Sequence, residues 1–289
     1  MEVGKRIVYK VSGEALKGKL RINMQALHDL INKNLVGTLY DSKLGNICEE
    51  DIIKLVSTPS NIDEEMVEIV CNGAKELHKN NKEVIIVPGA GNLWRGRQKT
   101  SNMDEILADQ IGMLGINMNA LAIGEKLERM GISSRVISSV PVEEFGIEYN
   151  DIRKNKKNLS NGEVLVIGGG TGSPLCTSDS ATIKAAHEYN ADTILFGKSI
   201  DGIYDSDPRK NKEARKYKYL TYEKLIEDQL RLGVANQGVM DFEAMARLLK
   251  HPIDLITYLA NDETAIKKII NNEDIGTTIT KKVKKPEFY

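Results

Sequence analysis

The stretch "EVLVIGGGTGSPLCTSDSA", residues 163–181, places an apolar run directly before a glycine-rich turn and a pattern typical of a helix start. A short run of aliphatic and β-branched residues that ends on glycine indicates a strand buried on both faces. The chain repeats this pattern. Further runs of the same kind, which we expect to form strands, are 6–13, 83–89, 134–140, 192–197 and 253–259.

Helical patterns separate these apolar runs. Residues 63–81 and 103–131 have the spacing of helices. In the second segment, apolar side chains recur every three or four residues at Leu107, Ile111, Leu114, Met118 and Leu121. The alternation of strands and helices predicts an α/β fold with right-handed crossovers and a mainly parallel central sheet sandwiched between helices.

Composition excludes several classes of protein. With 289 residues, of which 41% are hydrophobic and 28% charged, the chain is long and apolar enough to bury a substantial core. Lysine and arginine total 40 against 41 acidic residues, so the net charge predicts no nucleic-acid or membrane partner. An anion would therefore need a local site. The basic tail, 281–289, is expected to be a solvated end.

Cysteine and histidine usage predicts a reducing compartment and no zinc site. The cysteines are few, odd in number and far apart, and the histidines share no ligand spacing. We expect no segment that spans a bilayer and no signal peptide, hence a cytoplasmic protein. The residues concerned are Cys48, Cys71, Cys176, His28, His78, His187 and His251.

Three glycine-rich turns follow predicted strands, at 10–18, 88–96 and 168–181. The second reads GxGxxxxG, and no GxxxxGK[ST] occurs, so neither a dinucleotide fingerprint nor a Walker P-loop is present. Glycine turns that lead into helices point backbone N–H groups outward and bind anions. A single turn of this kind can equally well be a tight strand-to-helix connection that binds no anion. Three at one sheet edge, with Lys10, Arg95, Asp179 and Lys198 beside them, predict a site for more than one phosphate.

Six motifs occur in a fixed order: "KRIVYKVSGEAL", "GAGNLWRG", "ADQIGMLGINMNALA", "GTGSPLCTSDSA", "IDGIYDSDPRK" and "GVMDFEAMARL". With them the chain resembles the bacterial UMP kinases, a branch of the amino acid kinase superfamily. The resemblance covers residues 1–16 and about 62–280. The "DGIYDSDP" segment by itself is typical of the superfamily, whereas "NLWRG", "TGSP" and the late "VMD" together indicate the UMP kinase branch.

The resemblance implies a single domain over 1–289, with an acceptor lobe at about 1–160 and an ATP lobe at about 161–280. It implies an enzyme that transfers the γ-phosphoryl group of ATP, with Mg²⁺, to UMP and so makes UDP for pyrimidine nucleotide biosynthesis. It also implies a homohexamer. These kinases are unrelated to the P-loop kinases, which agrees with the missing Walker motif.

The resemblance gives catalytic roles to four residues. Lys10 matches the lysine that neutralises charge on the transferring phosphoryl group, a reaction that gains most from positioned positive charge. Asp241 matches an aspartate that orients the catalytic lysine and the metal-nucleotide. Asp179 either caps the helix that follows or lies near the transferring phosphate. Lys198 matches either an ATP-contacting threonine position or a nearby lysine.

The same resemblance implies a UMP site. Arg95 is the expected phosphate clamp, because a guanidinium grips a phosphate with two parallel hydrogen bonds. Asp109 matches the aspartate that receives the ribose hydroxyls. The other residues implied to bind UMP are Gly89, Ala90, Thr171, Gly172, Ser173, Pro174, Leu175, Cys176, Thr177 and Ser178.

The ATP site implied by the resemblance shares residues with the catalytic set. It consists of Lys10, Val11, Ser12, Gly13, Gly91, Arg95, Lys198, Ser199, Tyr204 and Asp207. We expect no metal site built by protein side chains alone, so Mg²⁺ accompanies ATP. No strong general base is expected either, since an acceptor phosphate oxygen is already ionised.

Several residues depart from the family pattern. Ala90 replaces a central glycine and adds a Cβ where the acceptor phosphate approaches, so we expect a slightly displaced site. Ser173 replaces an asparagine that contacts uracil, Leu175 and Cys176 replace aromatic residues, and Glu105 stands where an arginine is common. Selectivity for UMP over CMP or dUMP is therefore open, and UTP inhibition is open as well.

The largest departure is an insertion at 17–61, where the family has a short connection with a loop used for GTP activation. That loop is absent, so GTP activation is not expected. Amphipathic pieces at 24–35 and 49–56 indicate a folded insertion. It either modifies a subunit contact, covers the nucleotide site or is inert. A second, small insertion precedes Asp241.

Two other functions remain as alternatives. One is a different amino acid kinase that phosphorylates a small acid, which the NLWRG and TGSP motifs disfavour. The other is a catalytically silent nucleotide-binding assembly on the same fold. The presence of Lys10, Asp179 and Asp241 disfavours the second alternative.

Overall fold

The computed structural model describes residues 2–18, 20–22, 57–59, 61–94, 103–232 and 240–289. Its strands are β1 (Arg6–Val11), β2 (Leu20–Ile22), β3 (Ser57–Pro59), β4 (Glu83–Pro88), β5 (Ser134–Ser138), β6 (Glu148–Tyr149), β7 (Val164–Gly168), β8 (Thr193–Lys198), β9 (Tyr217–Leu220), β10 (Asp254–Leu259), β11 (Thr277–Ile279) and β12 (Glu287–Phe288). Its helices are α4 (Glu64–Lys79), α5 (Glu105–Arg129), the short 3-10 helix η2 (Glu143–Phe145), α6 (Ile152–Ser160), α7 (Ser178–Glu188), α8 (Tyr222–Leu232), α9 (Phe242–Lys250) and α10 (Ala265–Ile270).

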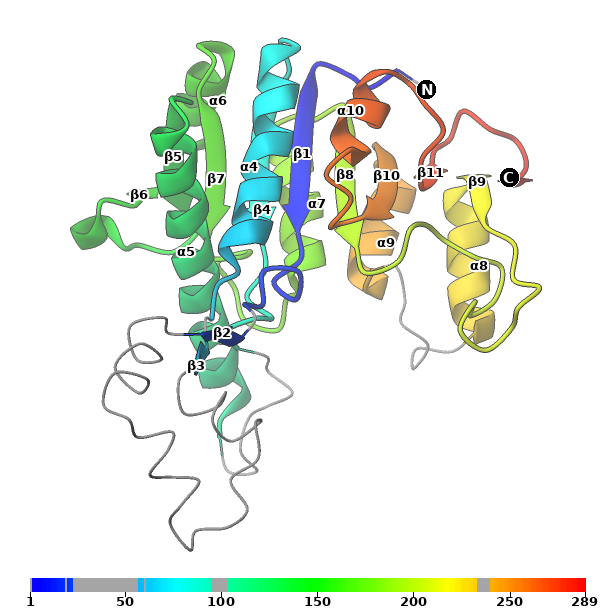
Figure 1. Ribbon diagram of the computed structural model, residues 1–289, viewed down its shortest axis with the longest axis horizontal. Coiled ribbons are helices and arrows are strands. Elements are labelled where there is room, and N and C mark those ends of the chain that lie inside the picture. The colour runs from blue at the N-terminus through cyan, green and yellow to red at the C-terminus, as the bar shows by residue number, and fades with distance from the viewer. Residues whose placement is uncertain (1, 19, 23–56, 60, 95–102, 233–239) are drawn as a thin grey trace, which may run out of the picture.

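One large sheet runs through the whole molecule, in the strand order β12-β9-β11-β10-β8-β1-β4-β7-β5-β6. The strands from β10 to β6 in this order pair in parallel. Their carboxyl ends point to the lower edge in Figure 1. The predicted α/β fold with a mainly parallel sheet is confirmed. The six expected strands correspond to β1, β4, β5, β7, β8 and β10, whereas the shorter strands of the sheet were not predicted.

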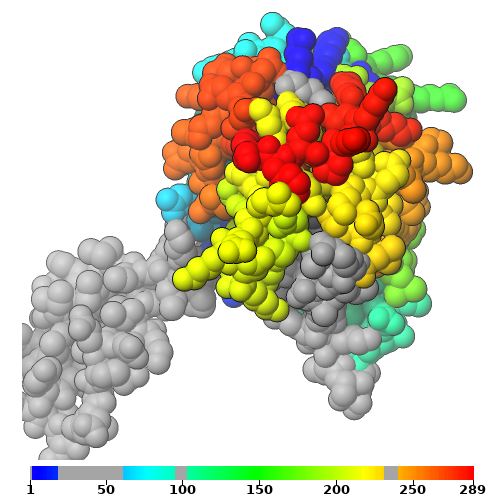
Figure 2. Space-filling view, turned by 90° about the vertical axis from the view of Figure 1, so that its right-hand side faces the viewer, coloured from blue at the N-terminus to red at the C-terminus, as the bar shows by residue number. Residues whose placement is uncertain are grey.

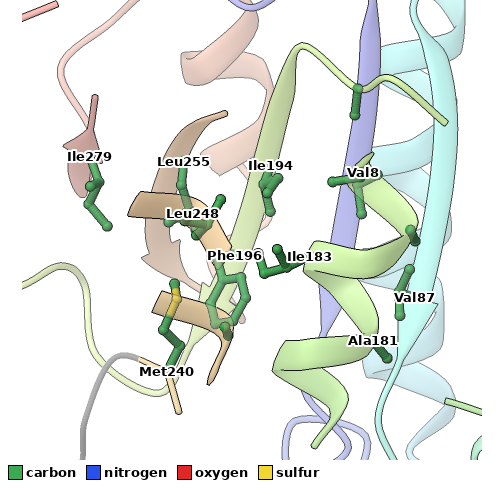
Figure 3. Packing of buried hydrophobic residues seen from close by; sticks show 14 of the residues in the cluster. Val8, Val87, Ala181, Ile183, Ile194, Phe196, Met240, Leu248, Leu255 and Ile279 are labelled. Carbon is green, nitrogen blue, oxygen red and sulfur yellow. The ribbon is translucent and has the colours of Figure 1, made fainter. Parts of the chain in front are cut away.

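The sheet is buried on both faces because successive side chains of a strand point to opposite sides. On β1, Val8 packs in the cluster beneath α7 and α9, and Ile7 and Tyr9 pack in the cluster beneath α4, α5 and α10. Figure 3 shows the first cluster, in which Phe196 of β8 lies among side chains of the neighbouring helices. This two-sided burial explains the continuous apolar runs of the sequence.

Helix α5 has an exposed apolar stripe. The residues of this stripe have the three-to-four-residue spacing from which the helix was predicted. The exposed side chains include Leu107, Leu114, Met118 and Leu121, which are 41–56% exposed. Small residues together with Ile116, Ile123 and Leu127 form the buried side of α5. By length and apolar composition alone, α5 is the one described helix that could cross a bilayer, and core helices pass the same test. In the fold it packs on β7 and β5.

The C-terminal segment belongs to the sheet, which corrects the expectation of a solvated tail. β12 pairs antiparallel with β9, and Phe288 stacks on Tyr217 with ring centroids 4.4 Å apart. The hydroxyl of Tyr289 donates to the carbonyl of Gly276. Figure 2 shows the segment in red across the β9 side of the molecule. Its lysines remain exposed, while the residues that follow them are fixed by pairing and stacking.

Only the two ends of the expected insertion at 17–61 are described. There β2 and β3 pair antiparallel, with Leu20 opposite Pro59. The predicted amphipathic pieces at 24–35 and 49–56 lie outside the described residues, as do residues 233–239 of the second insertion and Cys48. Cys71 and Cys176 are free thiols.

Candidate active site

The glycine-rich turns after β1 and β4 lie against each other at the carboxyl edge of the sheet. The backbone N–H of Gly89 donates to the carbonyl of Val11 at 2.9 Å. A Cβ on Gly13 would lie 2.1 Å from the backbone nitrogen of Gly91, so only glycine fits at position 13. The predicted convergence of these two turns is therefore present, and Ser12 lies beside it.

Helix α5 fixes the turn after β4 through a buried amide. Asn119 is fully buried and donates from Nδ2 to the carbonyl of Gly89 at 2.7 Å. It also exchanges hydrogen bonds with the side chain of Asn92, at 2.8 and 3.0 Å. Asn119 was not among the predicted site residues, although a polar residue on the buried side of a helix indicates a structural role because such groups are hydrogen-bonded.

Ala90 is accommodated by α5. Its side chain is buried, and its Cβ points at Gly115, where a side chain would come within 3.1 Å of it. Gly115 leaves room for this Cβ, and the expected displacement of the acceptor phosphate stays a prediction. The indole N–H of Trp94 donates to the carbonyl of Ala108 at 2.8 Å and supports the turn from the same helix. Arg95, the expected phosphate clamp, lies outside the described residues.

The third turn, between β7 and α7, lies beside the second. Gly172 has a φ of +77°, and Ser178, the first residue of α7, has its hydroxyl 3.3 Å from where a Cβ on Gly89 would lie. Asp109 of α5 accepts a hydrogen bond from the backbone N–H of Leu175 at 2.6 Å. Asp109 thus ties α5 to the loop of predicted UMP-binding residues. In that loop, Thr171 bonds to Ser173, and Ser173, Pro174, Leu175 and Cys176 are partly or fully exposed.

The start of α7 excludes a capping role for Asp179. Thr177 is the N-cap, and its hydroxyl accepts from the backbone N–H groups of Asp179 and Ser180. Asp179 therefore does not cap the helix. Its carboxylate instead reaches β1 and β8, where it meets both predicted lysines.

Lys10, Asp179 and Lys198 form a charge cluster at the carboxyl edge of β1 and β8. The ammonium of Lys10 lies 2.9 Å from Oδ1 of Asp179, and that of Lys198 lies 3.8 Å from Oδ2. Lys10 is 5% exposed in its side chain and Lys198 22%. Lys10 is buried and Lys198 half-buried, and two such cations that share one carboxylate make a local concentration of positive charge, which suits a phosphate.

Burial shifts the protonation of this cluster. Burial lowers the pKa of Lys198 to about 8, against the attraction of Asp179 and with repulsion from Lys10. Burial alone would raise the pKa of Asp179, but the attraction of Lys10 and Lys198 and the hydrogen bond from Lys10 hold it below its ordinary value. Asp179 is thus an anion at neutral pH, and Lys198 titrates near the physiological range.

Asp241 joins the charge cluster from α9 and does not pair directly with Lys10. It is the N-cap of α9, where it accepts from the backbone N–H of Ala244 at 2.8 Å. It also accepts hydrogen bonds from the hydroxyls of Thr177 and Ser180. Asp241 therefore links the starts of α9 and α7, and its charge acts on Lys198.

A cavity of about 950 Å³ opens beside the charge cluster. This volume suits a nucleotide-sized ligand. Seven predicted residues line the cavity, namely Lys10, Ser12, Asp179, Lys198, Ser199, Tyr204 and Asp207. Further lining groups that the sequence analysis did not identify are Gly202, Ile203, Leu225, Gln229, Thr257 and Leu259.

The loop after β8 gives the cavity a hydrogen-bonded wall. The hydroxyl of Tyr204 donates to Asp201 at 2.9 Å, and Lys216 donates to the same carboxylate at 3.0 Å. Burial, together with this carboxylate, raises the pKa of Tyr204 to about 12. Asp207 bonds to the backbone and side chain of Arg209. The sequence analysis missed Asp201, which holds Tyr204 in place.

At the carboxyl edge of a mainly parallel sheet, glycine-rich turns lie beside Lys10 and Lys198. This arrangement is typical of α/β proteins that bind phosphate groups. Residues 49–256 match the profile of the amino acid kinase family, and the chain belongs to that family. The uridylate kinase of Oenococcus oeni is 39% identical over 225 residues, which are 76% of this chain and 89% of that protein. The uridylate kinase of Mycoplasmopsis synoviae is 36% identical over 222 residues, which are 76% of this chain and 90% of that protein.

Solved structures agree with the family assignment. The UMP kinase of Bacillus anthracis superposes with a TM-score of 0.78 and 25% identity, over 100% of both chains. The UMP kinase of Ureaplasma parvum gives a TM-score of 0.75 and 27% identity, over 96% of this chain and 99% of that chain. The fold is therefore the amino acid kinase fold.

Proposed function

We propose that this protein transfers the γ-phosphoryl group of ATP to UMP and produces UDP and ADP for pyrimidine nucleotide biosynthesis. The observation that carries the proposal is the cluster of Lys10, Asp179 and Lys198. It lies where the cavity meets the glycine-rich turns, between the two sets of predicted nucleotide-binding residues. The names of the relatives, uridylate kinase and UMP kinase, support the choice of acceptor.

The cavity is the proposed ATP site. ATP would enter with its phosphates toward Lys10 and Lys198 and its base toward the wall around Tyr204. The backbone of Val11, Gly13 and Gly91 supports this assignment, because the close approach of the two turns brings backbone N–H groups to the same edge.

The acceptor site lies on the other side of the cluster in this proposal. Gly89 and Ser178 are adjacent there, and Asp109 contacts the loop at Leu175. A carboxylate at the start of a helix suits a ribose diol. Arg95 is kept as the predicted phosphate clamp on the strength of the sequence, and Arg95→Ala should weaken UMP capture.

The chemistry requires positioning and charge. An oxygen of the UMP phosphate attacks the γ-phosphorus, the bond from that phosphorus to the β,γ-bridging oxygen breaks, and ADP leaves with the negative charge. Lys10 and Lys198 would offset the charge that develops on the transferring group. Asp179 holds both lysines in place. No proton has to be removed from the acceptor.

Mg²⁺ is proposed as part of the substrate, bound to the phosphates of ATP. Such binding is usual for Mg²⁺, which keeps several waters and relies on substrate phosphates. Among the described residues, no three or more acidic, histidine or cysteine side chains converge as a ligand group.

A homohexamer in the cytoplasm is the proposed state of the enzyme. The apolar stripe of α5 supports self-association, because contiguous exposed apolar side chains mark interaction surfaces. We also propose that β1 to α6 supply an acceptor lobe, at about 1–160, and that the elements from β7 onward supply an ATP lobe, at about 161–280.

An acceptor panel tests the proposed function. Purified protein with ATP and Mg²⁺ is offered UMP, CMP, dUMP or a small carboxylic acid, and ADP release is followed. We expect saturable turnover with UMP and a loss of orders of magnitude in Lys10→Ala, which should keep its fold. Turnover of a small acid in place of UMP would favour a different amino acid kinase, and no turnover of any acceptor would favour a silent nucleotide-binding protein.

A further inference from the structure

Phe196 lies in contact with both lysines of the charge cluster. On the sheet, Phe196 of β8 is the Cα partner of Lys10 on β1, and Lys198 follows two residues later on the same face of β8. The ammonium of Lys10 lies 4.5 Å from the centroid of the Phe196 ring, and that of Lys198 lies 4.2 Å from it. Both distances are within the range of a cation–π interaction.

The ring also serves the hydrophobic core, so its two roles have to be separated. Phe196 is fully buried and packs in the cluster beneath α7 and α9. Figure 3 shows it on the same face of β8 as Ile194, with Ile183 and Leu248 nearby. A core position needs only volume and apolarity, which leucine or methionine would supply. Contact with two ammonium groups needs the negative face of an aromatic ring.

Asp179 compensates the two lysines unequally. Two like charges share one carboxylate, and Asp179 lies closer to Lys10 than to Lys198, at 2.9 Å against 3.8 Å. Lys198 therefore has the weaker ion pair, and it has the shorter distance to the ring. The geometry gives Lys198 a second partner where its carboxylate is more distant.

We propose that Phe196 is a positioning residue whose ring holds the ammonium groups of Lys10 and Lys198 against Asp179 at the point of phosphoryl transfer. This inference rests on the proposed function. Phe196 acts through the lysines and touches no reacting atom. Its place is set by strand register, because residues paired across β1 and β8 and residues two apart on β8 share one face of the sheet.

Weakening the cation–π contact with Phe196 should change the pKa of Lys198. Among the described residues, the charged groups that act on Lys198 are Asp179 from α7, Lys10 from β1 and Asp241 from the start of α9. Burial already lowers the pKa of Lys198 to about 8. Since a cation–π contact favours the charged form, its weakening lowers this pKa further, by about 0.5 to 1 unit. The alkaline limb of the rate profile should move to lower pH by the same amount.

Fluorination of the ring is the sharpest test, because it weakens the negative face and nearly preserves shape. The full-length chain is made with 3,4,5-trifluorophenylalanine at position 196 and, as a matched control, at position 288. Phe288 has its own cation–π contact, with Arg215, on the β9 side of the fold. The titration of Lys198 is followed by NMR of isotope-labelled lysine, with Lys198→Met for assignment, and kcat is measured against pH.

With the substitution at 196, we expect the Lys198 titration and the alkaline limb of kcat to shift down together by about 0.5 to 1 pH unit. The substitution at 288 should move neither. Phe196→Leu should show the same direction of shift. An unmoved titration and an unmoved limb would reduce Phe196 to a core residue. A shifted titration in a protein that transfers no phosphoryl group would refute the proposed function, and with it this role.

Discussion

Lys198→Met should make the protein more stable and less active at neutral pH. In the folded chain, burial lowers the pKa of Lys198 from 10.5 to about 8. The charged lysine therefore opposes folding below pH 8, and the difference of about 2.5 units corresponds to about 3 kcal/mol. Methionine has a similar length and no charge, so it removes this cost while Asp179 keeps its pair with Lys10.

The contribution of Lys198 to the free energy of unfolding depends on pH. Between pH 8 and 10.5 the unfolded chain binds the proton of Lys198 and the folded chain does not, so this residue makes stability rise with pH. The gain from Lys198→Met should therefore be largest below pH 8 and should approach zero near pH 10.5.

Urea unfolding of both proteins at pH 7 and near pH 10.5, at one protein concentration, measures the gain. Activity at pH 7 should fall by about 100-fold, the usual order for loss of one charge-stabilising donor. Lys154→Met is the control, because Lys154 is half exposed and its ion pair with Glu148 should contribute less than about 1 kcal/mol. If Lys198→Met is less stable at pH 7, or if its gain in unfolding free energy does not change with pH, the charge of Lys198 does not destabilise the fold.

Three further outcomes follow from the geometry. Gly13→Ala should cost several kcal/mol in urea unfolding, because its Cβ would lie 2.1 Å from the Gly91 nitrogen, whereas Gly131→Ala, with open space around it, should cost about 1 kcal/mol. Asp241→Asn should lower kcat more than it raises the KM for UMP, and the reverse pattern would place Asp241 in substrate binding. Leu114→Asp should reduce the oligomer mass in light scattering, and an unchanged mass would remove the α5 stripe from the interface.

Local patterns were sufficient to predict the central strands. Val8, Ile86 and Leu195 lie in runs that are apolar on both faces, and such runs require a sheet covered on both sides. Strand β12 could not be predicted in this way. It consists of two residues after a lysine-rich segment, and its stability comes from Phe288 stacking on Tyr217, a contact between distant parts of the chain.

The charged residues of the candidate site could be predicted, because their side-chain type indicates their chemistry. Lys10, Asp179 and Lys198 were identified from glycine-rich turns and ordered motifs, and they meet in the structure. The partners that hold them are set by tertiary placement. Phe196 has an ordinary core sequence context, and its contact with Lys10 depends on the register of β1 and β8. Asn119 could have been identified from its place on the buried side of α5.

In the proposed reaction, ATP and UMP meet at the cluster of Lys10, Asp179 and Lys198. Its most direct test is a single-turnover reaction in which the enzyme, in excess over ATP labelled in the γ-phosphate, is mixed with UMP and Mg²⁺ and quenched. The label should appear in UDP, and Lys10→Ala should abolish this transfer while still binding ATP. Label that appears only in inorganic phosphate, or stays in ATP with every acceptor nucleotide, would contradict the proposed reaction.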